Sequence, residues 1–216
     1  MQTINIEGLG YREINEGIRH TPACKLTGCR GQRFLGAGMG FGELIIEGIP
    51  GNALGAYLNG GNITVLGNAQ DAVGDTMNAG EIIVHGSIGD AAGYAMRGGR
   101  ILIKGEAGYR AGIHMKAYED KVPVMVIGGS AGSFLGEYQA GGIIIVLALK
   151  GGRPVGNFPC TGMHGGKMLL RGDCGDIALP DQVTARPAGQ EDIAEVSEHI
   201  RAFCETFGYD MDEIIE

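Results

Sequence analysis

A glycine-punctuated repeat of nineteen residues constrains the fold of this chain more than any other feature of its sequence. Short apolar runs, rich in β-branched residues, each end at a small residue, and four of these glycines are nineteen residues apart: Gly48, Gly67, Gly86 and Gly105. The pattern continues at spacings of 23, 20 and 24 residues, to Gly128, Ala148 and Gly172. Such self-similarity indicates a repeat architecture of seven stacked units.

A second glycine marks one place within every unit. Nineteen residues are too few for two helices and their turns, but they suit short strands joined by tight corners, where glycine permits positive φ and close stacking. The sequence therefore predicts an all-β fold: a single-stranded right-handed parallel β-helix of about seven coils. A leucine-rich horseshoe needs an asparagine and leucine pattern that is absent here. The expected structural glycines are Gly36, Gly55, Gly74, Gly93, Gly112, Gly136 and Gly162.

Alternation along each run predicts which side chains face the interior. In the first run, Leu44 and Ile46 should point inward and Ile45 outward. One residue of each run should then form an outward ladder: Ile45, Thr64, Ile83, Leu102, Met125, Ile145 and Leu169. Six of these seven are apolar, whereas a solvated sheet face would be polar, so we expect this face to be covered. We expect the broadest apolar part to remain partly open as an interface, formed by Met125, Ile127, Ile143, Ile145 and Leu147.

The last part of the chain changes period. Apolar residues recur at helical spacing from Ile193 to Phe207, and Gly208 can end that helix. The predicted organisation is an N-terminal segment over 1–35, a β-helix over 36–180 and an acidic helical tail over 181–216. This tail helix and a partner subunit are the two candidates to cover the outward ladder.

Charge and cysteine content limit the partners and the compartment. The segment from Gly189 onward carries the whole net charge of −8, and residues 1–188 are neutral, so no basic stripe indicates nucleic acid. No apolar run is long enough to span a membrane. Five scattered cysteines favour a reduced, cytoplasmic protein. The role of Cys24 and Cys29 stays open, because one pair is a weak metal signal.

No residue spacing indicates a catalytic, cofactor-binding or metal site in this chain. The glycine-rich loops could cradle a phosphate only at the start of a helix, and no helical pattern follows them. His164 is interpreted as part of a lengthened corner and His85 as a solvated residue on the outer face. No nucleophile and base fall at catalytic spacing.

The repeat nevertheless carries a family likeness. The units with G-x-x-G-x-x-x-G loops, and the segment from Thr161 to Gly166 followed by the run from Met168 to Gly172, resemble the C-terminal β-helix domain of the glutamate synthase large subunit. The likeness covers about residues 30 to 175, and the tail is similar to that of stand-alone versions of this domain. The β-helix subunit of formylmethanofuran dehydrogenase and a subunit of N-methylglutamate synthase share the repeat.

The resemblance implies a non-catalytic structural or assembly subunit of a glutamate-synthase-type complex, which makes glutamate from glutamine and 2-oxoglutarate. The implied partners are an FMN-binding synthase subunit and a glutamine amidotransferase subunit, and a homo-oligomer is possible. FMN and an iron–sulfur cluster are expected in a partner subunit and none in this chain. The alternatives are one of the other two complexes, a β-helical carbohydrate-active or acyltransferase enzyme, and a self-assembling rod.

Overall fold

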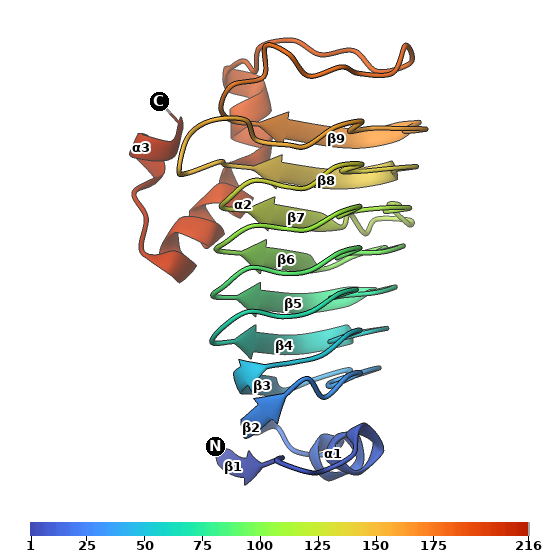
Figure 1. The fold of residues 1–216 in the computed structure, drawn as a ribbon, viewed down its shortest axis with the longest axis vertical. Coiled ribbons are helices and arrows are strands. Elements are labelled where there is room, and N and C mark those ends of the chain that lie inside the picture. Colours follow the sequence, from blue (N-terminus) through green and yellow to red (C-terminus); the bar gives the residue numbers. More distant parts are fainter. Residues whose placement is uncertain (216) are drawn as a thin grey trace.

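The computed structural model describes residues 1–215 and confirms the parallel β-helix (Figure 1). Nine parallel strands form one sheet in chain order, and each pairs with the next. The strands are β1 (Gln2–Asn5), β2 (Ala23–Arg30), β3 (Glu43–Ile49), β4 (Asn59–Val65), β5 (Ala79–Val84), β6 (Arg100–Ile103), β7 (Val124–Ile127), β8 (Ala140–Val146) and β9 (Gly165–Leu170). The helices are α1 (Tyr11–Ile18), α2 (Gln190–Phe207) and α3 (Met211–Ile215).

The interior of the coil is a stack of apolar columns. Leu44, Ile63, Ile82 and Ile101 are aligned on successive strands, and all four are buried, as the alternation predicts. Ile46 and its equivalents form a second buried column. Full burial of one such side chain contributes about 1.5–3 kcal/mol, and a single coil could not enclose it.

The sheet begins earlier than residue 36, the predicted boundary. β1 and β2 add two strands below the seven predicted runs, and α1 lies between them in the chain and across the lower end of the coil (Figure 1). Ile14 and Ile18 of α1 are buried in the interior core. The N-terminal segment is therefore the first part of the β-helix together with its cap.

The corner glycines are required by both conformation and space. Gly55 and Gly74 have φ of 63° and 69°, and the other predicted glycines also have positive φ. A Cβ on Gly55 would lie 2.7 Å from Cδ1 of Ile82, which belongs to the next coil. A larger residue would therefore be strained and would push against the core.

In the last coil, the structural-glycine position lies two residues before the predicted Gly162. The Gly136 N–H donates to the Ala111 carbonyl one coil below, and the Cys160 N–H donates in the same way to Leu135. Cys160, with φ of 61°, thus occupies the structural-glycine place, while Gly162 follows Tyr138 in an outer column. A Cβ on Gly136 would meet Cε of Met168 from the next coil at 2.8 Å, but among residues 1–215 no further strand lies above Cys160.

The predicted outward ladder is also wrong at one residue. Met125 is aligned with Ile101 and lies in the interior, so Val126 takes the outward place beside Leu102. The cause is the pair of glycines after this run. The Gly129 N–H donates to the Gly105 carbonyl, so Gly129 and not Gly128 is the equivalent of Gly105. The run is apolar on both faces, so its composition could not reveal the slip.

Helix α2 confirms the predicted tail. It ends at Gly208, which has a left-handed φ of 76° and whose N–H donates to the Cys204 carbonyl at 2.8 Å. This is the usual glycine end of a helix. Figure 1 shows α2 and α3 on the outer side of the upper strands.

Candidate interaction surfaces

The outer face of the sheet is covered by the tail of the same chain over its upper coils. Leu102, Val126 and Ile145 lie against α2 and form a second hydrophobic core. Phe203, fully buried, is central to it, and a Cβ on Gly128 would lie 2.6 Å from its Cζ. The absence of a side chain at Gly128 lets the ring rest on the sheet.

This arrangement corrects the expected open interface. Met125 and Ile127 lie inside the coil, in the first core. Ile143, Ile145 and Leu147 do face outward, but the tail buries all three. Of the two candidate covers, the tail helix is the one that occupies this face.

Beyond the cover the outward residues are mixed, because the apolar Ile45 on β3 stands among polar ones. Glu43, Asn62 and Thr64 take the outward places on the lower strands. Leu66 and Leu147 occupy the same outward position just after their strands, yet Leu66 is 48% exposed and Leu147 is 2% exposed. The burial of the outward leucines thus follows the reach of the helix.

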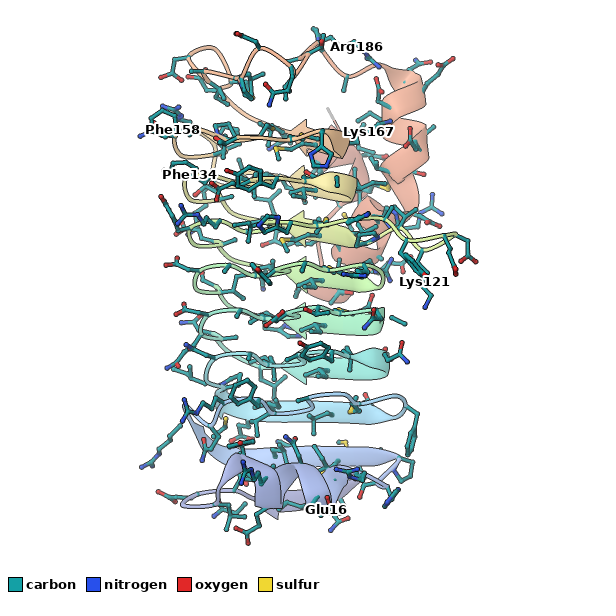
Figure 2. The ribbon with its side chains drawn as sticks, turned by 90° about the vertical axis from the view of Figure 1, so that its right-hand side faces the viewer. Glu16, Lys121, Phe134, Phe158, Lys167 and Arg186 are labelled. Atoms are coloured by element: carbon teal, nitrogen blue, oxygen red, sulfur yellow. The ribbon has the colours of Figure 1, made fainter. Side chains whose placement is uncertain are left out.

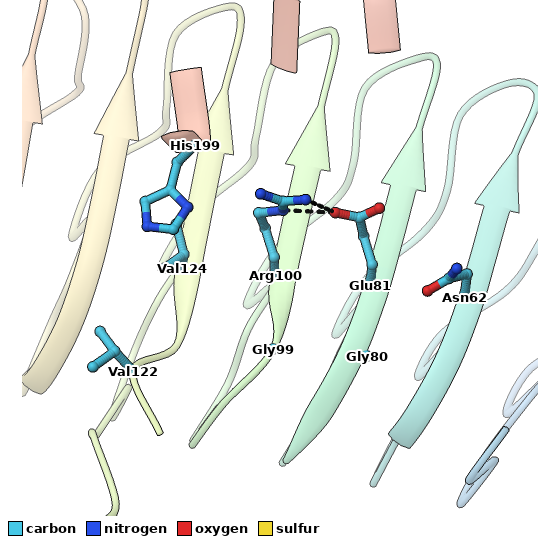
Figure 3. Close-up of a pocket in the computed structure, with 8 residues that line it drawn as sticks. All are labelled: Asn62, Gly80, Glu81, Gly99, Arg100, Val122, Val124 and His199. Atoms are coloured by element: carbon cyan, nitrogen blue, oxygen red, sulfur yellow. Dashed lines mark hydrogen bonds and ion pairs between the residues drawn. The ribbon is translucent and has the colours of Figure 1, made fainter. Parts of the chain in front are cut away.

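A groove of about 410 Å³ lies where α2 meets the beginnings of the strands (Figure 3). Arg100 pairs with Glu81 there, with its Nε 2.6 Å from the Glu81 carboxylate, and the neighbouring His199 extends from α2. Burial lowers the pKa of His199, with a smaller lowering from Arg100 opposed by Glu198. The charges of Arg100 and Glu81 satisfy one another, whereas the buried Nδ1 of His199 has no hydrogen-bond partner among residues 1–215.

The histidines and cysteines that the sequence singled out lie apart. His85 is half-buried against Phe207 of the tail, with ring centroids 5.2 Å apart, and is not the solvated residue expected. His164 is exposed in its corner. Cys24 and Cys29 are buried free thiols whose pKa burial raises. Within residues 1–215, no three His, Cys, Asp or Glu side chains are grouped to hold a metal.

The turns opposite the covered sheet carry exposed aromatic ladders that sequence reasoning missed. His114 stacks on Tyr138 at 5.1 Å between ring centroids, and Tyr94 contacts His114 edge-on at 5.8 Å. A second ladder joins Tyr109, Phe134 and Phe158 at 5.2–5.3 Å. Figure 2 places Phe134 and Phe158 one above the other, at the edge away from α2. The signal was the recurrence of His114 with Tyr138, and of Phe134 with Phe158 once Cys160 is aligned with Gly136. Tyr94 and Tyr109 lie one residue away from these places and do not recur in register.

An arginine lies against the second ladder. Arg110 lies over the rings of Tyr109 and Phe134, and its Nε donates to Glu137 at 2.6 Å. The Glu137 side chain is only 8% exposed, and this hydrogen bond raises the pKa of Arg110. We call the following residues the turn patch: Tyr94, Arg97, Tyr109, Arg110, His114, Lys116, Phe134, Glu137, Tyr138 and Phe158.

Fold and surfaces together define a parallel β-solenoid whose outer sheet face is covered over its upper coils by the tail of the same chain. Comparison with known proteins gives the family: the model of the GXGXG motif matches residues 13–216. The chain belongs to this family, the glutamate synthase domain 3 family, as the resemblance in its sequence predicted.

One curated protein and one solved structure are similar to this chain. An uncharacterized protein of Methanocaldococcus jannaschii is 44% identical over 223 residues, covering 97% of this chain and 85% of that protein. A chain in the crystal structure of the formyltransferase/hydrolase complex of Methylorubrum extorquens with methylofuran has a similar fold. It aligns with a TM-score of 0.65 at 22% identity, over 90% of this chain and 70% of that chain. In residues 1–215, no helix has the length and apolar character needed to cross a bilayer.

Proposed function

We propose that this chain is a non-catalytic assembly subunit of a glutamate-synthase-type oxidoreductase complex, which docks the FMN-binding and glutamine amidotransferase subunits. The observation that carries the proposal is the GXGXG family match, which extends over residues 13–216. FMN and an iron–sulfur cluster belong, in this proposal, to a partner subunit.

The geometry supports assembly over catalysis or self-assembly. The Arg100–Glu81 pair in the groove is mutually satisfied, and Cys160, with a pKa raised to about 11 by burial, is no nucleophile at neutral pH. Helix α1 closes the lower end of the coil, and residues 172–189 pass over the upper end (Figure 1). Capped ends oppose the axial stacking that a self-assembling rod needs.

The test is reconstitution with the FMN-binding and amidotransferase subunits of the same organism. We expect a stable complex on size-exclusion chromatography, and we expect the isolated chain to lack glutaminase and glutamate synthase activity. Robust ammonia-dependent glutamate formation by the isolated chain would contradict the non-catalytic role.

A formyltransferase/hydrolase-type complex is the alternative setting, because a chain of similar fold is part of such a complex in M. extorquens. Affinity purification of the chain from its own cells would discriminate the two. Co-purification of formyltransferase or hydrolase subunits, with no amidotransferase, would favour the alternative.

A further inference from the structure

We propose that the turn patch is a docking surface for a partner subunit that presents carboxylates among apolar side chains. The inference rests on the proposed assembly function and deepens it, because it names the face that binds and the chemistry of the partner.

The first support is the exposure of large aromatic side chains in the two ladders. Tyr94, Tyr138 and Phe158 are 41%, 46% and 59% exposed. In the Phe134 column the lowest coil carries Phe34, but the three coils above it carry small residues, namely Ala53, Ala72 and Ala91. A recurring corner therefore does not need aromatic residues. Contiguous exposed aromatic area of this kind is enriched in protein interfaces.

The second support is charge. Arg97 and Lys116 occupy the same place in adjacent coils, since the Lys116 N–H donates to the Met96 carbonyl and the Arg97 N–H to that of Met77. Both side chains are exposed, and among residues 1–215 neither forms an ion pair. The one acid of the patch, Glu137, is enclosed beside Arg110. The patch thus presents cations whose complement is a partner carboxylate.

The orientation of the rings also favours a negatively charged partner. The planes of His114 and Tyr138 are 13° apart on successive coils, so their faces meet along the rod and their edges point sideways. Aromatic edges carry partial positive charge, which favours carboxylate oxygens over cations. Together, the ring edges, Arg97 and Lys116 fit an acidic surface with apolar contacts at the ring rims.

The experiment measures binding of the FMN-binding and amidotransferase subunits, each tested separately by titration calorimetry. One variant combines Arg97→Glu with Lys116→Glu, and another is Tyr138→Ser. Each should weaken binding of one subunit by about tenfold or more. Increased salt should weaken binding of the wild-type chain and have less effect on the charge-reversed variant.

Matched controls lie on the same turn face, outside the patch. Tyr57 is 60% exposed in the Tyr138 column, and Arg33 is an exposed arginine of the first corner. Tyr57→Ser and Arg33→Glu should leave binding unchanged. Equal unfolding midpoints for all variants separate a binding effect from misfolding, and a variant that unfolds is replaced by Tyr138→Phe, which keeps the stack and should keep binding.

The outcomes separate the two proposals. If the wild-type chain binds a subunit and the patch variants bind it equally well, the docking surface is wrong and the assembly function stands. If the wild-type chain binds neither subunit, the assembly function itself fails, and the docking proposal fails with it. Self-association through the patch without subunit binding would identify a second copy as the occupant and also overturn the proposal.

Discussion

The covered sheet face and the turn patch are both apolar outer surfaces of one solenoid, but only the first is closed by its own chain. The sheet face is aliphatic, and α2 buries Leu102, Val126 and Ile145 on it. The turn patch is aromatic and cationic, and in residues 1–215 no helix packs over Tyr138 or Phe158, which remain about half exposed.

The difference shows how an outward apolar residue is to be interpreted in a repeat protein. A permanent aliphatic ladder needs an intramolecular cover, because about 25 cal/mol is gained for each square ångström of apolar surface removed from water. Aromatic residues with polar tips and neighbouring cations tolerate water and still contribute to a reversible interface.

The largest expected effect comes from a charge placed under the tail. Leu147→Asp buries a carboxylate in the apolar core under α2 and should cost about 3 kcal/mol or more. Leu66→Asp, in the same outward position but 48% exposed, should cost less than about 1 kcal/mol. Urea unfolding measures both, and trypsin cleavage after Arg201 reports release of the tail. Equal costs would mean that the tail does not protect this face.

A second prediction compares one phenylalanine from each surface. Phe203→Ala removes the fully buried ring over Gly128 and should destabilise the chain by about 3–5 kcal/mol. Phe158→Ala removes a ring that is mostly exposed and should cost less than about 1 kcal/mol while weakening partner binding. A comparable loss of thermal stability in both variants would show that the turn patch is structural and not an interface.

The contrast also explains what the sequence could predict. The coil, the corner glycines and the tail helix follow from periodicity, because each coil repeats the same local constraints. The predicted outward direction of Met125 was wrong, because both faces of its strand are apolar and two glycines follow the strand. The groove at His199 joins α2 to strand residues that lie 75 to 137 positions earlier, and such a contact depends on where the tail docks.

A third prediction addresses the corners beneath the turn patch. Gly93→Val places a β-branched residue at φ of 66°, with its Cβ 2.6 Å from Cε of Met125, and should cost about 1–3 kcal/mol. Cys160→Gly, at the equivalent place in the last coil, should change stability by less than about 1 kcal/mol, because relief of strain offsets the lost packing. Denaturant midpoints test both. An unchanged midpoint for Gly93→Val would show that this corner does not need glycine.

The smallest expected effect is a pH dependence confined to the covered face. Burial lowers the pKa of His199 and of His85 below the usual 6.5, with contributions from Arg100 and Lys104 of the same sign and an opposing one from Glu198. The folded state therefore binds fewer protons than the unfolded chain as the pH falls below about 6.5, and stability declines there. We expect the unfolding midpoint to be lower at pH 5.5 than at pH 7.5, and His199→Gln to reduce that difference. His20→Gln, an exposed residue at the lower end of the rod, should not alter it. A difference that His199→Gln and His85→Gln together leave intact would assign the pH dependence to groups outside the tail interface.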